Sequence, residues 1–209
     1  VGVSMPELAT NQHVPELARQ GKAAQKQFHA WGHKRPLMYR IFMPGASPAA
    51  IAVGLKHGQN YCWDAGQCRL RYAWYGGFVD PSPVWRGNGN GLAGVLGTKY
   101  WESEMPGTIR VGGADSEPEF LGYKKVDGQP EFHFRVNDTD VYELITPLHS
   151  IIGIQRSFRI PNNTQPVSLP VGPTSRVTFE HSAGKLENGL LTLSAEEARA
   201  FTVFIGLIK

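Results

Sequence analysis

Two cysteines, Cys62 and Cys68, occur in the chain, and both belong to the segment CWDAGQCRLRYAWYGGF at residues 62–78. Redox thiols normally occur as Cys-x-x-Cys and covalent haem requires Cys-x-x-Cys-His, so this spacing disfavours a redox site and excludes haem c. A hairpin would bring the two side chains to a Cβ separation of about 4.5 to 5.5 Å, from which a disulfide forms after small adjustments. We therefore predict a structural Cys62–Cys68 disulfide, which stabilises the fold by roughly 2 to 3 kcal/mol in the loop-closure account. The alternative is a pair of free, buried thiols.

Other residue types that could bind a metal or catalyse hydrolysis lack the spacing that such sites need. His29 and His33 would share one face of a helix, but neither the glutamate of His-Glu-x-x-His nor a third ligand accompanies them. The glycine-rich residues 87–91 lack the Gly-Lys-Ser/Thr ending of a phosphate loop. For a non-covalent haem, the spacing of the seven histidines and four methionines selects no pair of axial ligands. Carboxylates for acid-base hydrolysis are scattered, at Asp64, Asp80, Glu102 and Glu104. We therefore predict no cofactor, no metal and no catalytic residue.

Aromatic and basic residues after Cys68 are candidates for binding. Arg69 and Arg71 alternate with apolar residues, which predicts both guanidinium groups on one strand face, where they could pair with carboxylates of this protein or of a partner. Large aromatic side chains follow at Trp74, Tyr75, Phe78, Trp85, Tyr100 and Trp101. They either pack in a core or form a surface that stacks sugars or docks a protein.

The composition limits the class of protein that carries these residues. A chain of 209 residues, 41% of them hydrophobic, can bury one substantial core. The net charge of +3 is small and the 21 basic residues are scattered, which disfavours nucleic-acid binding. The longest apolar runs, at residues 49–55 and 200–208, fall short of the roughly 18 residues that cross a bilayer. Any membrane association is therefore expected to come through a partner.

Two features suggest an exported protein. The closely spaced cysteines fit an oxidising compartment, where a disulfide persists. Because the chain begins at Val1 rather than Met, we also expect a processed or shortened product.

Residues 1–35 differ from the rest of the chain and are predicted to form an arm that is extended and partly helical. They are polar and lack strand alternation, yet a helix over residues 15–30 would carry one thin apolar stripe, formed by Leu17, Ala24, Phe28 and Trp31. Such a stripe needs a surface to cover it, either on its own domain or on another protein. We therefore count its large side chains, Leu17, Phe28 and Trp31, as candidate partner contacts.

From Pro36 onward, short alternating segments separated by turn residues predict strands. The clearest hairpin has Asp127-Gly128 as a two-residue turn with positive φ between residues 120–126 and 131–136. Alternation in its second strand turns Phe132, Phe134 and Val136 inward and Glu131, His133 and Arg135 toward water. Later, Ser194 to Glu197 matches a helix capping box and predicts at most one helical turn. We predict an all-β fold, a two-sheet antiparallel β-sandwich over residues 36–209 that follows the arm.

Several runs resemble a β-rich domain of exported bacterial proteins that is often joined to c-type cytochrome modules. The runs are RIFMP at 40–44, AIAVGL at 50–55, NYCWDAGQCRLRYAW at 60–74 and GGFVD at 76–80, and they continue through Gly122-Tyr123 and Pro130 to Phe132. The resemblance covers about residues 36–160. Because the sequence contains no Cys-x-x-Cys-His, the resemblance implies that the haem sits on a separate polypeptide.

The resemblance and the arm together predict a non-catalytic accessory subunit in the periplasm. We expect it to dock on a c-type cytochrome or another exposed subunit of a membrane electron-transfer complex, such as a photosynthetic reaction centre. The candidate contacts are Leu17, Phe28, Trp31, Arg69, Arg71, Trp85 and Trp101. The alternative is a carbohydrate-binding or carbohydrate-active β-sandwich, for which the aromatic residues between 74 and 101 would form the binding surface.

Overall fold

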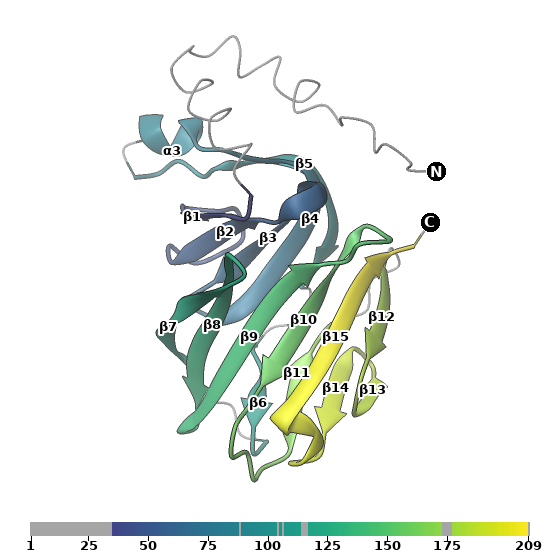
Figure 1. Cartoon of the computed structure of the whole chain (residues 1–209). Coiled ribbons are helices and arrows are strands. Elements are labelled where there is room, and N and C mark those ends of the chain that lie inside the picture. The colour runs from purple at the N-terminus through teal and green to yellow at the C-terminus, as the bar shows by residue number, and fades with distance from the viewer. Residues whose placement is uncertain are drawn as a thin grey trace.

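A computed structural model describes residues 35–87, 89–103, 105, 107–113, 117–172 and 177–208. Almost all of the arm predicted over residues 1–35, including Leu17, Phe28 and Trp31, lies outside the described residues. The described part of the chain is nearly all β, with antiparallel strands, and it forms a sandwich (Figure 1). The predicted fold class is confirmed.

The strands form three sheets. In the five-stranded sheet the spatial order is β1 (Leu37–Arg40), β2 (Ala50–Gly54), β3 (Gln59–Asp64), β4 (Arg69–Asp80) and β5 (Gly94–Glu102). In the six-stranded sheet it is β12 (Val177–His181), β15 (Ala200–Leu207), β10 (Gly153–Arg159), β9 (Thr139–Pro147), β8 (Gln129–Val136) and β7 (Glu119–Val126). In the four-stranded sheet it is β13 (Lys185–Glu187), β14 (Leu190–Leu193), β11 (Val167–Pro170) and β6 (Arg110–Val111).

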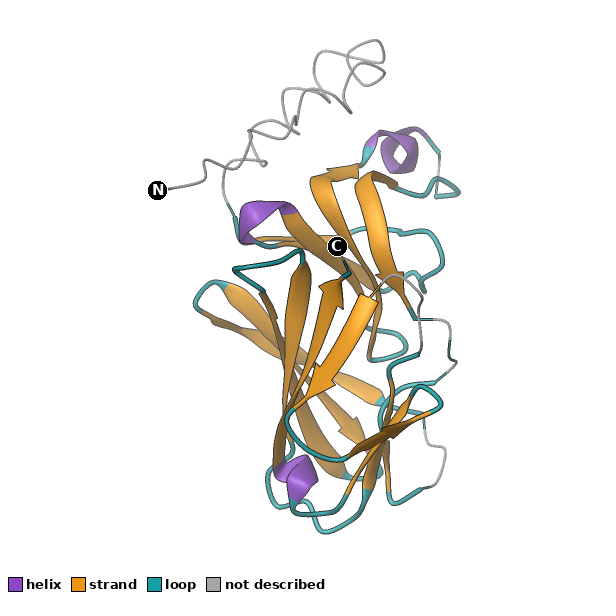
Figure 2. Cartoon of the chain, turned by 90° about the vertical axis from the view of Figure 1, so that its right-hand side faces the viewer, coloured by secondary structure: helices purple, strands orange, loops and turns teal. Residues whose placement is uncertain are grey.

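Three short helices complete the described elements. They are the 3₁₀-helix η1 (Lys56–Gly58), the α-helix α3 (Ser82–Arg86) and the 3₁₀-helix η2 (Glu197–Arg199). Figure 2 shows α3 and η2 at opposite ends of the molecule. The capping box before η2 forms as predicted, because Ser194 N donates to Glu197 Oε2 at 2.8 Å and Glu197 N donates to Ser194 Oγ at 3.3 Å.

The predicted hairpin of β7 and β8 is present. Asp127 and Gly128 take φ values of 50° and 82°, which the short turn requires. Phe132, Phe134 and Val136 are buried, as the alternation predicts. The Asp127-Gly128 turn and the alternation of inward-facing and outward-facing residues were sufficient to predict this pair of strands.

Residues from all three sheets share one main core. Trp63 of the five-stranded sheet stacks on Phe132 of the six-stranded sheet, with ring centroids 4.0 Å apart and planes 3° apart. Leu169 and Leu191 of the four-stranded sheet join the same cluster. The six-stranded sheet therefore forms one layer, and the two smaller sheets together provide the opposite side of the core.

A second, smaller core lies on the other face of the five-stranded sheet, and we call it the cap core. Its buried members are Ile41, Met43, Ala50, Ala52, Cys62, Tyr72, Trp74, Phe78, Val79 and Ala93. The five-stranded sheet is thus covered on both faces, which explains why every residue of β2 and β3 is buried.

A β-bulge at Arg71 in β4 separates the two cores along that strand. Cys62 pairs with Tyr72 while the next residue, Trp63, pairs with Leu70, so Arg71 is the extra residue. As a result Leu70 belongs to the main core whereas Tyr72 belongs to the cap core. Strict alternation over residues 69–72 fails here for this reason.

The predicted disulfide is wrong: Cys62 and Cys68 are both free and buried. Cys62 lies in the cap core, whereas Cys68 follows the β3–β4 turn with a φ of 47° and lies in the main core. The strand partner of Cys62 is Tyr72, and the two thiols are on opposite sides of the sheet. Burial raises the pKa of each thiol to about 12, so both are protonated at neutral pH.

Candidate functional site

The segment between β4 and β5, residues 81–93, is the strongest candidate for a binding surface, and we call it the cap. It contains α3, whose first turn is set by Pro83 and by Asp80, whose Oδ1 accepts a hydrogen bond from Ser82 N at 2.9 Å. Trp85 on α3 is 45% exposed, and Leu92 near the end of the cap is 50% exposed. Two large apolar side chains on one short segment are therefore open to solvent.

The cap packs on the cap core through Val84 and Ala93. Below the cap, Trp74 Nε1 donates to Gly77 O at 2.9 Å and the Trp74 ring stacks with Phe78. Gly91 packs so closely against the backbone of Pro83 that no side chain would fit there. The close approach of Gly91 to Pro83 and the packing of Val84 on the cap core position α3, which carries Trp85.

A shallow hollow lies beside Leu92. It has a volume of about 160 Å³ and is lined by Phe42, Met43, Ala46, Ser47, Pro48, Gly89 and Leu92. The lining is mostly apolar, and it continues the apolar surface that Leu92 begins. Such a hollow suits an apolar side chain of a partner.

The two predicted contact arginines of β4 are used within the chain. Arg69 Nη1 donates to the backbone oxygens of Met105 and Gly107, each at 2.9 Å, and so holds the loop after β5. Arg71 Nε donates to Gly45 O at 2.8 Å. Both side chains are half-buried and their partners are carbonyl oxygens, so their first role is to position loops.

Most of the predicted aromatic surface is inside the protein. Trp74 is fully buried in the cap core, and Tyr100 and Trp101 are 4% and 2% exposed in the main core. Trp101, named above as a candidate contact, therefore presents no surface to a partner. Of the aromatic set between residues 74 and 101, Trp85 is the exposed member and Tyr75 is half-buried.

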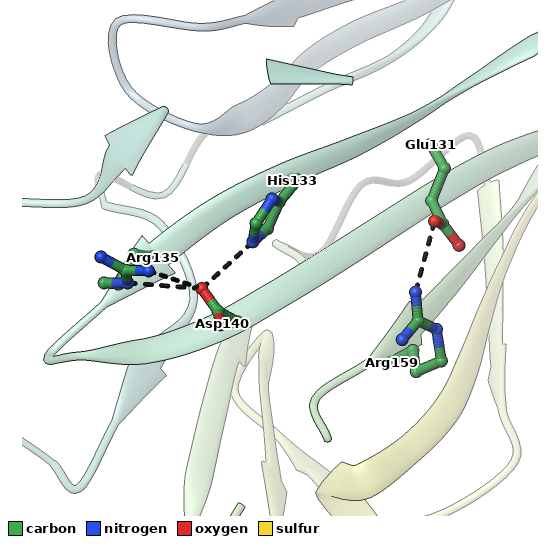
Figure 3. A network of polar contacts seen from close by, with 5 residues as sticks. All are labelled: Glu131, His133, Arg135, Asp140 and Arg159. Atoms are coloured by element: carbon green, nitrogen blue, oxygen red, sulfur yellow. Dashed lines mark hydrogen bonds and ion pairs between the residues drawn. The ribbon is translucent and has the colours of Figure 1, made fainter. Parts of the chain in front are cut away.

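The outer face of the six-stranded sheet carries a network of charged side chains (Figure 3). Asp140 Oδ1 lies 3.1 Å from His133 Nε2 and 3.2 Å from Arg135 Nη2. The hydrogen bond from His133, followed by those from Arg135, lowers the pKa of Asp140. Glu131 Oε2 bridges Arg159 at 3.3 Å and Lys124 at 2.9 Å. The charges on this face are therefore largely matched with one another.

Tyr142 of β9 lies between His133 of β8 and Arg159 of β10. The His133 ring stacks on it at 4.4 Å between centroids, and the Arg159 guanidinium lies 4.0 Å from the Tyr142 ring centroid. Strand alternation predicts that His133 lies on the outer face, but it does not predict the residues that His133 contacts. These depend on the pairing of β8 with β9 and of β9 with β10. With its ring already in contact with two side chains, Tyr142 is poorly placed to stack a sugar.

A buried polar group inside the main core was also missed. Arg156 Nε donates to Glu143 Oε1 at 2.6 Å, and Trp63 Nε1 donates to Glu143 Oε2 at 2.9 Å. The signal was present in the sequence, since Glu143 stands between inward-facing Val141 and Ile145. All three side chains satisfy one another, which indicates a structural role.

Comparison with protein families, curated proteins and solved structures finds no match to the chain. The resemblance described from the sequence therefore stays a prediction. In the described part of the chain, no helix has the length and apolar character needed to cross a membrane.

Proposed function

We propose that this protein is a non-catalytic accessory subunit that docks, through its cap, on a c-type cytochrome or another exposed subunit of a membrane electron-transfer complex, such as a photosynthetic reaction centre. The observation that carries the proposal is the exposure of Trp85 and Leu92, 45% and 50%, on a segment anchored by the cap core. Tryptophan is among the residue types enriched at binding hot spots, and a side chain that is already positioned loses less entropy on docking.

The nature of the partner and the periplasmic location are inferred from the resemblance in residues 36–160. The predicted disulfide was one argument for an oxidising compartment and therefore for export. Because both cysteines are free, that argument no longer applies. Arg69 and Arg71 remain candidate contacts with the partner, but they are weaker candidates than Trp85 and Leu92, because each already donates to backbone oxygens of its own chain.

The test is retention of the protein in its native complex. Membranes from cells that carry the tagged full chain are solubilised in mild detergent, and the proteins that copurify are identified and quantified. Trp85→Ala and Leu92→Ala should each reduce copurification at least tenfold. Leu121→Ala, which removes a 39% exposed side chain from β7, is the matched control and should not. Equal copurification of all three variants would rule out docking through the cap.

A carbohydrate-binding or carbohydrate-active sandwich is the second candidate, because an exposed Trp85 could also stack on a sugar ring. A glycan array distinguishes the two functions. Saturable glycan binding that Trp85→Ala abolishes, together with no copurifying protein, would favour the carbohydrate function. Absence of glycan binding with a stable copurifying subunit would favour docking.

A further inference from the structure

Two histidines from separate loops face each other at one end of the sandwich. His57 belongs to η1 between β2 and β3, and His149 lies in the loop between β9 and β10. Their ring centroids are 6.0 Å apart and their planes are inclined by 76°. Both side chains are exposed, and they line a groove of about 210 Å³ together with Tyr75, Leu148, Ile151 and Ile152.

A buried glutamine ties the two loops together. Gln59, only 2% exposed, donates from Nε2 to Leu148 O at 2.8 Å and accepts at Oε1 from Gly153 N at 2.7 Å. It thereby joins the end of the His57 turn to both ends of the loop that carries His149. The separation of the two histidines is thus set by hydrogen bonds between the loops as well as by the sheet.

The backbone at His57 is also held in a defined conformation. His57 has φ of 60° and ψ of 30°, in the left-handed region that few side chains other than Asn, Asp and His adopt readily. The following Gly58 has φ of 72°, and Leu55 N donates to Gln59 O at 2.7 Å across the turn. This tight turn directs His57 from a fixed position.

From this geometry we infer that His57 and His149 form a two-imidazole site for a divalent transition metal ion, of which Cu²⁺ and Zn²⁺ are the best suited. Imidazole nitrogen is the ligand these ions share, and Cu²⁺ binds nitrogen sites most tightly in the divalent series. Bonds of about 2.0 to 2.1 Å at a tetrahedral angle place two ring centres roughly 5 Å apart. Side-chain rotation of two exposed rings closes the remaining gap.

The bound ion would have coordination positions that no protein side chain fills. Within the described residues, no three His, Cys, Asp or Glu side chains gather as a metal-binding group. Water completes the coordination. Binding should therefore be weaker than in closed four-ligand structural sites, and the bound ion stays accessible to an external ligand.

The test is titration of the full chain with Cu²⁺, followed by calorimetry and electron paramagnetic resonance. His13, His29 and His33 could bind Cu²⁺ by themselves, so all proteins carry His13→Gln, His29→Gln and His33→Gln. We expect one equivalent of Cu²⁺ with two coordinated nitrogens, displaced by excess Zn²⁺. His57→Asn, which tolerates the positive φ, and His149→Gln should each weaken binding at least tenfold.

His181→Gln is the matched control, because His181 is a described histidine outside the groove, with Nδ1 3.0 Å from Ala183 O. This variant should bind Cu²⁺ as the parent does. Circular dichroism verifies that each variant is folded. The inference is overturned if the parent binds no Cu²⁺ with two nitrogens, or if His57→Asn and His149→Gln bind it as tightly as His181→Gln.

Discussion

Arg156 and Glu143 form an ion pair 2.6 Å long inside the main core, with side chains 4% and 1% exposed. Glu143→Gln keeps the shape of the side chain and an acceptor for Trp63 but leaves the guanidinium of Arg156 without a counter-charge. Removing one partner of a buried pair costs about 3 to 5 kcal/mol. Guanidinium chloride unfolding should therefore show a loss of that size in the free energy of unfolding.

The control is Glu187→Gln, which removes the exposed partner of Lys185 and should cost less than about 1 kcal/mol. A second comparison is the double variant Glu143→Leu with Arg156→Met, which removes both charges and should be more stable than Glu143→Gln. Equal losses for Glu143→Gln and Glu187→Gln would show that the buried pair does not stabilise the fold.

The two thiols should react slowly in the native protein. Because burial raises the pKa of Cys62 and Cys68 to about 12, we expect little reaction with Ellman's reagent at pH 8 until the chain is unfolded. Without any reductant, denaturation followed by alkylation should add two labels, measured by mass spectrometry. An unlabelled chain that becomes labelled only after reduction would contradict the free thiols.

The Asp140 network should stabilise the protein in a pH-dependent way. Its pKa is lower in the folded than in the unfolded chain, so the stabilisation is present above the unfolded pKa, near 3.9, and is lost as the pH falls through the lower folded pKa. Asp140→Asn should cost less than about 1 kcal/mol at pH 7, since the side chain is 41% exposed. Urea unfolding at several pH values measures the difference.

The difference between the parent and Asp140→Asn should shrink toward zero below the folded pKa of Asp140. A difference that stays constant from pH 7 to pH 2 would assign the effect to packing rather than to charge. Glu187→Gln serves as the exposed carboxylate control.

The close packing of β4 against β5 should depend on glycine at position 97. A Cβ atom at Gly97 would overlap Tyr75 O and lie 2.9 Å from Trp74 Cδ1, because β4 and β5 approach closely there. Gly97→Ala should therefore cost about 1 to 3 kcal/mol through overpacking. Gly94→Ala, in the same strand, meets Asp80 Cβ at an ordinary 3.4 Å and is the control. Thermal unfolding of the two variants compares them, and equal melting temperatures would contradict the close approach.

The parts of the fold that were predictable are local. The β7–β8 hairpin follows from Asp127-Gly128 and from alternation in β8, and the single turn of η2 follows from Ser194 and Glu197. In each case the deciding interactions join residues that are close in sequence. The all-β class follows from the repetition of such signals along the chain.

The parts that were not predictable depend on register between strands. The extra residue Arg71 shifts the pairing of β3 with β4, which places Cys62 and Cys68 on opposite sides of a sheet. Tyr100 and Trp101 are consecutive yet both lie in the main core, because the pairing of β4 with β5 also shifts at that point. Partners such as Glu143 and Arg156 are cross-strand neighbours whose meeting depends on which strands pair.

The same extra residue constrains how β4 can change in evolution. Arg71 stands between Leu70, which contributes to one core, and Tyr72, which contributes to the other. Because Arg71 is the extra residue of the bulge, deleting it would leave Leu70 and Tyr72 consecutive and on opposite sides of the sheet, so each core would keep its residues and only the bulge would be lost. Homologues should therefore be able to lose Arg71 together with the bulge, whereas a deletion at a regularly paired residue of β4 would exchange the sides of the residues beyond it.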